Sequence, residues 1–172
     1  MDAESAYAIL VEKVDSFFAA AMERGADLRC GSGCSGCCQV ELTVSAIEAA
    51  GIRRLLREAP RQPEGPAGAC VFLDVEGRCQ IYDARPLVCR SQGLPLSYPP
   101  DVVPVDAVRG TLEDRDLTWC PLNFTERPPN VPDVLDAARA DEALAQINRH
   151  FCTERGIDPL WRVSLRTLHA ER

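Results

Sequence analysis

Apolar residues recur every three or four positions early in the chain, which is the spacing of a helix that buries one face. The pattern predicts a helix over residues 3–24 that ends at Gly25. Its buried stripe comprises Tyr7, Leu10, Val11, Val14, Phe17, Phe18 and Ala21. A second helix is predicted after Ser45, because Ser45 and Glu48 have the spacing of a capping box, and Pro60 would end this helix.

The same periodicity returns near the end of the chain and predicts two closing helices, over residues 133–154 and 159–169. The dipeptide Asp158-Pro159 is a typical start signal for the second of these helices. The buried positions of the pair are expected to be Val134, Leu135, Ala138, Leu144, Ile147, Phe151, Leu160, Trp161, Ser164, Leu165 and Leu168.

Between the helical segments the pattern is different. Residues 60–69 predict a loop, and residues 70–82 predict a short β-hairpin around a Glu-Gly turn that would bring Cys70 and Cys79 close together. Asp83 is expected to cap a short helix with Pro86 in its first turn and Cys89 in its last. Residues 91–132 are rich in proline and predict mostly irregular structure, which Cys120 would anchor.

These elements predict a mainly α fold with a small β-hairpin and long irregular loops, gathered around a metal centre. A chain of 172 residues is long enough for one modest core, so we expect residues 1–172 to form a single cysteine-rich domain. The cysteine core would occupy about residues 28–122, with the N-terminal and C-terminal helices packed on it.

The net charge of −7 argues against nucleic acid or an anionic membrane as the main partner. No secretory leader and no membrane-spanning run is visible, so we expect a cytoplasmic protein. Thiols stay reduced in the cytosol, and a cysteine-dense chain is then better interpreted as metal-binding or redox-active than as a disulfide scaffold.

Four of the nine cysteines lie within nine residues, at Cys30, Cys34, Cys37 and Cys38. Thiolates at this spacing typically share a metal, and the intervening glycines favour a tight turn over a helix. Cys37 and Cys38 are adjacent, so their side chains diverge and would serve different metals or opposite sides of one cluster. The alternative interpretation, small buried hydrophobic residues, fits poorly with glycine-rich surroundings.

Four further cysteines are predicted ligands: Cys70, Cys79, Cys89 and Cys120. Cys152 lies on an amphipathic helix, where a buried cysteine needs no special account, and both histidines are expected at the surface or at helix ends. An all-thiolate site suits zinc, an iron–sulfur cluster or Cu(I). Arg85 and Arg90 flank Cys89 and would neutralise the charge of such a site without binding the metal themselves; ordinary surface arginines are the alternative.

The ordered motifs of the chain resemble the YkgJ-type cysteine-cluster family, also called the zinc- or iron-chelating CxxCxxCC domain. They are Cys30-x3-Cys34-x2-Cys37-Cys38, Cys70-x2-Leu73, Gly77-x-Cys79-x-Ile81-Tyr82, Arg85-Pro86 and Cys89-Arg90, and the resemblance covers about residues 28–122. It implies a small metal-binding domain whose members are often described as iron–sulfur proteins. A related domain in flagellin lysine N-methylase implies that one branch supports protein methylation.

The spacing Cys30-x3-Cys34-x2-Cys37 also occurs in radical S-adenosylmethionine enzymes, but the repeated strand and helix units of that fold are not visible. Two hypotheses remain. The first is a metal-binding protein in which eight thiolates hold zinc or iron, as one polynuclear centre or two separate sites, for metal handling or for an unidentified protein partner. The second is an iron–sulfur-dependent enzyme, redox or protein-modifying, like the lysine N-methylase.

Overall fold

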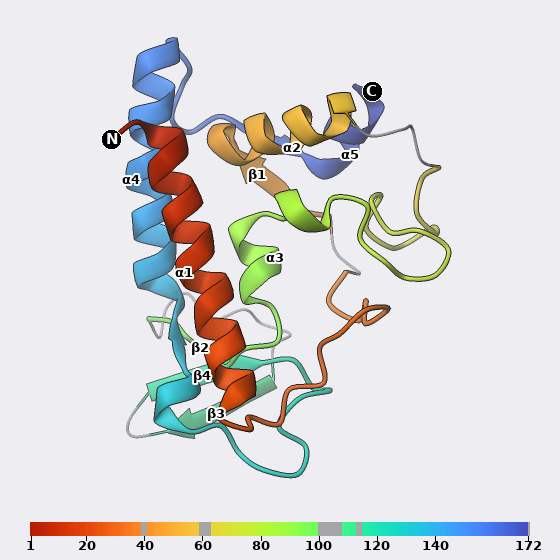
Figure 1. The fold of residues 1–172 in the computed structure, drawn as a ribbon, viewed down its shortest axis with the longest axis vertical. Coiled ribbons are helices and arrows are strands. Elements are labelled where there is room, and N and C mark those ends of the chain that lie inside the picture. Colours follow the sequence, from red (N-terminus) through yellow and green to blue (C-terminus); the bar gives the residue numbers. More distant parts are fainter. Residues whose placement is uncertain (39–40, 59–62, 100–107, 113–114, 172) are drawn as a thin grey trace. The chain divides into compact units, whose positions relative to one another are not determined.

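The computed structural model describes residues 1–38, 41–58, 63–99, 108–112 and 115–171. Helices dominate the structure, and short strands form two small sheets (Figure 1). The fold class predicted from the sequence, mainly helical with a small β component and long loops, is confirmed. The helices are α1 (Ala3–Glu23), α2 (Ala46–Glu58), α3 (Leu87–Ser91), α4 (Ala137–Arg155) and α5 (Leu165–Ala170), with short 3-10 turns η1 (Tyr82–Ala84) and η3 (Val131–Asp133).

The chain divides into two compact units, and each unit combines segments that are distant in the sequence. Unit 1 contains residues 1–7, 31–86 and 146–172, and unit 2 contains residues 8–30 and 87–145. The expectation of a single domain stays a prediction. The boundary between Cys30 and Gly31 separates the first cysteine of the clustered four from the other three.

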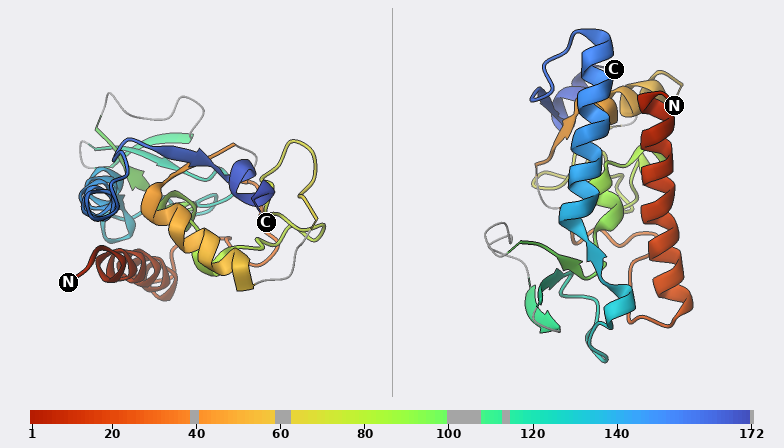
Figure 2. Two further views of the ribbon diagram at one scale, coloured as in Figure 1. Left: turned by 90° about the horizontal axis from the view of Figure 1, so that it is seen from above. Right: turned by 90° about the vertical axis from the view of Figure 1, so that its left-hand side faces the viewer.

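Unit 1 is built around a two-stranded sheet. Strand β1 (Thr43–Ser45) pairs antiparallel with β6 (Arg162–Ser164), with Val44 opposite Val163, and α2 and α5 follow these strands directly (Figure 2). The core beneath them contains Val44, Ala49, Ile52, Val71, Phe72, Ile81, Val163, Leu165 and Leu168. Cys70 and Cys79 pack against this core, so two of the predicted ligands have an apolar backing.

The contact between Ser45 and Glu48 that the sequence predicted at the start of α2 is present through the Glu48 carboxylate. The Glu48 carboxylate accepts hydrogen bonds from the Ser45 backbone N–H at 2.9 Å and from the Ser45 hydroxyl at 2.7 Å. These bonds satisfy the buried Ser45 and Glu48 side chains at the start of the helix. The helix extends to Glu58, and its predicted stop at Pro60 lies outside the described residues.

The prediction of a helix over residues 159–169 was wrong in its first half. Asp158 closes a turn, because its carboxylate accepts the Leu160 N–H at 2.9 Å, and the next residues form β6. Helix α5 begins only at Leu165, where the Ser164 hydroxyl accepts the Thr167 N–H at 3.0 Å as an N-cap. Sheet pairing with β1 therefore takes the residues that the periodicity assigned to a helix.

Unit 2 contains a four-stranded sheet in the order β3-β4-β2-β5, which lies near the lower end of α1 in Figure 1. The strands are β2 (Leu96–Ser97), β3 (Val108–Leu112), β4 (Arg115–Trp119) and β5 (Leu135–Asp136). Only the β2–β5 pair is parallel. The core of this unit contains Ala21, Leu28, Leu94, Leu96 and Ala137, with aromatic residues packed around it.

Three boundary predictions in and near unit 2 need correction. Residues 91–132 contain β2, β3 and β4, so this segment is less irregular than its prolines suggested. The helix expected from residue 133 begins at Ala137, because η3 and β5 occupy the residues before it. Asp83 lies inside η1 and does not cap α3, which begins after Pro86. Helix α1 ends as expected, with Gly25 at a φ of 78°.

Candidate metal centre

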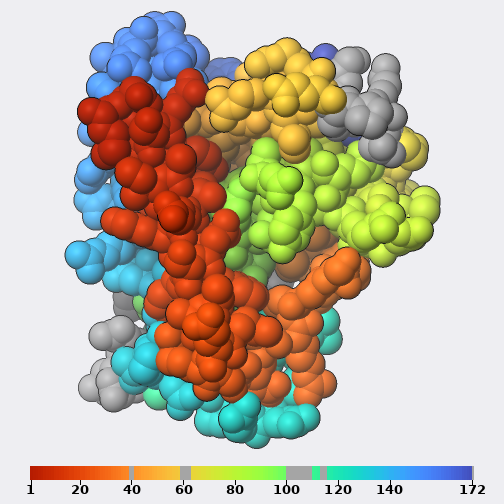
Figure 3. Space-filling model, in the orientation of Figure 1, coloured from red at the N-terminus to blue at the C-terminus, as the bar shows by residue number. Residues whose placement is uncertain are grey.

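Residues 31–38 of unit 1, called here the cysteine loop, consist of two successive tight turns. The Cys34 N–H donates to the Gly31 carbonyl at 3.0 Å, and the Cys38 N–H donates to the Ser35 carbonyl at 2.9 Å. Gly33 has a φ of 84°, which favours glycine. Cys34 and Cys37 are exposed and Cys38 is half-buried, and the orange segment that leads through this loop lies at the surface in Figure 3.

The cysteine loop is held against the segment that carries Cys70 and Cys79. The Cys70 N–H donates to the Cys38 carbonyl at 2.7 Å, so the backbones of these two cysteines are joined directly. At a second point Gly77 packs on Gly33: a Cβ atom at Gly77 would lie 3.2 Å from the Gly33 carbonyl oxygen. Cysteines that are far apart in sequence are therefore neighbours within unit 1.

The predicted hairpin over residues 70–82 is present as a tight turn with a single antiparallel bridge between Leu73 and Cys79. The Asp74 N–H donates to the Arg78 carbonyl at 2.9 Å, and Gly77 has a φ of 76°. The Gln80 N–H donates to the Phe72 carbonyl at 2.8 Å and continues the pairing beyond the bridge. The Glu-Gly turn is thus confirmed, although it carries no extended strands.

The thiols of unit 1 interact electrostatically with one another. A hydrogen bond with Cys38, then burial, then the charge of Cys38 raise the pKa of Cys37. Burial raises the pKa of Cys70 and of Cys79, and the charges of Cys70 and Cys37 add to the effect at Cys79. These shifts favour the protonated thiols, so deprotonation of the group needs a cation to compensate it.

Arg85 is a positive charge that acts on two of these thiols, Cys37 and Cys79. Its charge lowers the pKa of Cys37 and of Cys79, against the larger effects that raise both values. The guanidinium lies 3.7 Å from the centre of the Tyr82 ring, a cation–π contact that fixes its position. The role predicted for Arg85, compensating the charge of a thiolate site without binding the metal, stays a prediction.

Arg90, the other arginine singled out from the sequence, has a carboxylate partner. Its guanidinium binds the Asp15 carboxylate of α1 at 2.6 Å, and its side chain is only 7% exposed. Both residues belong to unit 2. The charge of Arg90 is thus offset by Asp15, which makes Arg90 first of all a connection between α3 and α1.

The remaining predicted ligands, Cys30, Cys89 and Cys120, belong to unit 2. Cys89 lies on α3, Cys120 follows β4 directly, and the Asn123 N–H donates to the Cys120 carbonyl at 2.9 Å to close a turn. The Asn123 side chain then donates to the Cys30 sulfur at 3.2 Å. Cys30 and Cys120 are therefore linked through one asparagine.

The segments around Cys30 and Asn123 are held together by several further bonds. The Phe124 N–H donates to the Asp27 carbonyl at 2.7 Å, and the Glu126 N–H donates to the Asp27 carboxylate at 2.8 Å. The Arg29 guanidinium binds the Glu126 carboxylate at 2.9 Å. The hydrogen bond from Glu126 is the largest of the causes that lower the pKa of Asp27.

The eight predicted ligands are thus five in unit 1 and three in unit 2. Within the described part of the chain, no three cysteine, histidine or carboxylate side chains are close enough together to hold one ion as they stand. The donor set still fits zinc or iron, because thiolates are ligands for both metals and the charges of Cys70, Cys37 and Arg85 all act on the Cys79 thiol. The complete eight-cysteine set stays a prediction.

Cys152 is buried, as the sequence suggested, and its exclusion from the ligand set stays a prediction. It is fully buried on α4, and its thiol donates to the Asn148 side-chain oxygen at 3.7 Å. Sequence reasoning missed Asn123. His169 lies in the last turn of α5, at a helix end as expected, but it is buried and packs edge-on against Phe72 with ring centres 5.5 Å apart. No spacing signal in the sequence distinguishes either residue.

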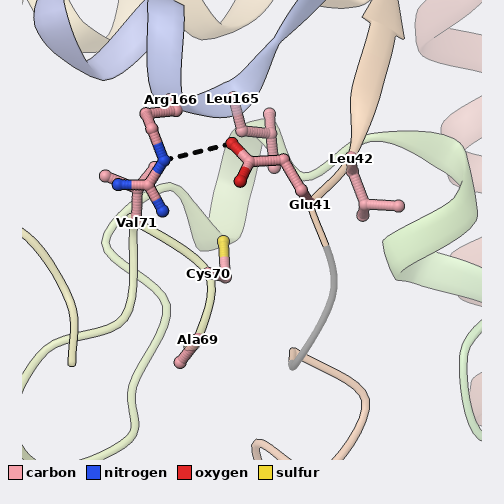
Figure 4. A pocket seen from close by; sticks show the side chains of 7 residues that line it. All are labelled: Glu41, Leu42, Ala69, Cys70, Val71, Leu165 and Arg166. Carbon is pink, nitrogen blue, oxygen red and sulfur yellow. Dashed lines mark hydrogen bonds and ion pairs between the residues drawn. The ribbon is translucent and has the colours of Figure 1, made fainter. Parts of the chain in front are cut away.

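A small cavity lies beside Cys70 (Figure 4). Glu41, Leu42, Ala69, Val71, Leu165 and Arg166 form its walls with Cys70, and Arg166 binds Glu41 at 3.1 Å near the cysteine sulfur. The enclosed volume is about 10 Å³, which is room for about one water molecule. Organic substrates typically need several hundred Å³, so this cavity does not provide a substrate pocket.

Clustered thiols, tight glycine turns and a compensating arginine define the class of cysteine-rich metal-binding proteins. Comparison with known families supports this assignment. Residues 29–121, more than half of the chain, match the CxxCxxCC family, described as "Putative zinc- or iron-chelating domain". The chain belongs to this family.

No curated protein and no solved structure gives a significant match to the chain. In the part of the chain that the structure describes, every helix is too short or too polar to cross a membrane.

Proposed function

We propose that the protein binds zinc or iron through the thiolates of its motif cysteines. The ligand set is Cys30, Cys34, Cys37, Cys38, Cys70, Cys79, Cys89 and Cys120. The observation that carries the proposal is the group in unit 1, where the Cys70 N–H donates to the Cys38 carbonyl at 2.7 Å and the charges of Cys70, Cys37 and Arg85 all act on the Cys79 thiol. The raised pKa values keep these thiols protonated in the metal-free protein, and a bound cation would displace the protons and compensate the charges of the thiolates.

Metal binding in unit 1 requires small movements of the cysteine loop. Cys34 and Cys37 are exposed on tight turns, so their sulfurs can move toward Cys70 and Cys79 without disturbing a helix or a strand. The apolar backing of Cys70 and Cys79 keeps those two sulfurs in place. We therefore infer that the loop closes on the metal, whereas the turn over residues 70–79 is preformed.

An iron–sulfur cluster is the alternative to single zinc or iron ions. All-thiolate coordination suits both kinds of metal centre. An enzyme that uses such a cluster is the second candidate function. The cavity beside Cys70 does not support this function, because the cavity is too small for an organic substrate. The description of the family names chelation of zinc or iron, which agrees with the first candidate function.

Purification of the full chain without oxygen tests the proposal directly. Iron, acid-labile sulfide and broad absorption at about 400 nm would identify an iron–sulfur centre. A colourless protein with stoichiometric zinc would identify thiolate zinc sites. Removal of the metal with a chelator should lower the melting temperature, because the metal stabilises the folded state. A fully reduced protein without bound metal would refute the proposal.

Two matched variants give this experiment a control. Cys79→Ala removes a proposed ligand that packs on the core of unit 1, and Cys152→Ala removes a fully buried cysteine outside the proposed set. Cys79→Ala should lower the metal content per chain, whereas Cys152→Ala should leave it unchanged. Equal metal content in both variants would remove Cys79 from the ligand set.

A further inference from the structure

We propose that Asn123 is a positioning residue of the metal site, which holds the Cys30 sulfur in place for coordination through a hydrogen bond donated by its side-chain amide. The inference rests on the proposed function, because it assigns Cys30 as a ligand. It adds a residue that belongs to no cysteine motif and that lies just beyond the matched family segment.

Asn123 is a buried residue whose side-chain amide makes three hydrogen bonds. It is 2% exposed, and its side-chain nitrogen donates to the Cys30 sulfur at 3.2 Å and to the Gly93 carbonyl at 2.8 Å. Its side-chain oxygen accepts the Arg29 backbone N–H at 2.8 Å. Because a backbone N–H can only donate and a carbonyl can only accept, these two partners fix which end of the amide faces Cys30. The sulfur is therefore the acceptor.

A second buried asparagine shows the opposite arrangement. The Asn148 oxygen accepts the Ile47 N–H at 3.1 Å, and its nitrogen donates to the Pro159 carbonyl at 3.1 Å. Like Asn123, Asn148 thus binds one backbone N–H and one backbone carbonyl. The Cys152 sulfur, however, lies 3.7 Å from the Asn148 oxygen, so the Cys152 thiol is the donor of that hydrogen bond. An acceptor sulfur is compatible with a metal-bound thiolate, whereas a donor sulfur must keep its proton.

The position of the Cys30 sulfur is also restricted by the backbone. Gly93 has a φ of 99°, and a Cβ atom placed there would overlap the Cys30 sulfur. The sulfur thus lies directly against the Gly93 backbone, in space that only a glycine leaves open. Asn123 and Gly93 together define one location for this sulfur, and Asn123 also closes the turn that begins at Cys120.

Hydrogen bonds donated to ligand sulfurs orient the ligand and reduce the electron density that it gives to the metal. Removing an outer-shell partner of this kind typically costs about 10–100-fold in metal affinity. Asn123→Asp preserves the side-chain volume and the acceptor for Arg29, but it replaces the donor facing Cys30 by a carboxylate oxygen. Asn148→Asp makes the same chemical change beside Cys152 and serves as the matched control.

The test is a competition titration of the full chain with Zn²⁺ and a chromophoric chelator. We expect Asn123→Asp to bind zinc about 10–100-fold more weakly than the unmodified protein, and Asn148→Asp to bind it equally well. In a Cys30→Ser background, Asn123→Asp should have little additional effect on affinity, because its sulfur partner is gone. Equal zinc affinity of Asn123→Asp and the unmodified protein, or equal losses in both asparagine variants, would overturn the inference.

A measurement on the unmodified protein keeps the inference testable if Asn123→Asp does not fold. In nitrogen-15 spectra, the side-chain amide resonances of Asn123 should shift when Zn²⁺ is added, whereas those of Asn148 should stay in place. An Asn123 amide that does not respond to bound zinc would contradict the inference. Failure of the unmodified protein to bind zinc or iron at all would instead refute the proposed function.

Discussion

Replacing Asp15 by asparagine tests whether Arg90 is a structural residue. The Arg90–Asp15 pair has a separation of 2.6 Å, and the two side chains are 7% and 44% exposed. Two unit charges about 4 Å apart attract by about 4 kcal/mol at the effective dielectric near a protein surface. Water around the half-exposed carboxylate screens part of this attraction. We therefore expect Asp15→Asn to lower the free energy of unfolding by about 1–3 kcal/mol.

Thermal and urea unfolding of the metal-loaded protein measure this change. A loss of this size corresponds to a fall of about 2–10 °C in melting temperature for a chain of this length. The control is Glu171→Gln, which breaks a pair with Arg53 whose side chains are 40% and 36% exposed and should cost less than about 1 kcal/mol. If Asp15→Asn is no more destabilising than Glu171→Gln, the Arg90 pair does not have the structural role assigned here. Zinc affinity of Asp15→Asn should match that of the unmodified protein.

Three further predictions follow from the site. The pKa of Asp27 is lowered in the folded protein, so its carboxylate stabilises the fold at a pH above the ordinary pKa of about 3.9. This stabilisation is lost as the pH falls through the lower pKa of the folded state. Asp27→Asn should thus be less stable than the unmodified protein at neutral pH, and urea unfolding should show the gap closing in acid; a gap independent of pH would contradict this. Arg85→Gln should weaken zinc binding in competition titrations more than Arg85→Lys, which keeps the positive charge. Equal zinc affinities of the two variants would argue that Arg85 does not compensate the charge of the thiolates. Gly93→Ala should destabilise the protein and weaken zinc binding more than Gly68→Ala does. Both glycines have a positive φ, but of the two only Gly93 would place the new methyl group on a sulfur, that of Cys30. Similar effects of both substitutions on zinc affinity would indicate that the Cys30 sulfur can move freely.

The parts of the fold that local chemistry determines could be predicted from the sequence. The contact between Ser45 and Glu48 and the glycine that ends α1 depend on residues a few positions apart, and both are present. The β1–β6 pair could not be predicted, because its strands have three residues each and Arg162 lies 119 residues from Thr43. Strand β4 includes Arg115 and Asp116, so no alternating apolar run marked it.

The candidate site shows the same division between local and distant information. The spacing of Cys34, Cys37 and Cys38 predicted thiolate chemistry, because such spacing has few other uses. The partners of those cysteines come from distant segments and have no spacing signal. Asn123 is the clearest example, since its role depends on a hydrogen bond to Cys30, 93 residues earlier in the chain.

The pairing of β1 with β6 has a consequence for the order of synthesis. The cysteine loop leaves the ribosome long before β6 and α5, which complete the sheet and supply Leu165 and Leu168 to the core behind Cys70 and Cys79. A nascent chain therefore presents reactive thiols before the surroundings that position them exist. A fragment limited to residues 29–121 would have the same defect, since it lacks the strand that pairs with β1. Complete packing behind Cys70 and Cys79 therefore requires the C-terminal segment, which recombinant work on this unit should include.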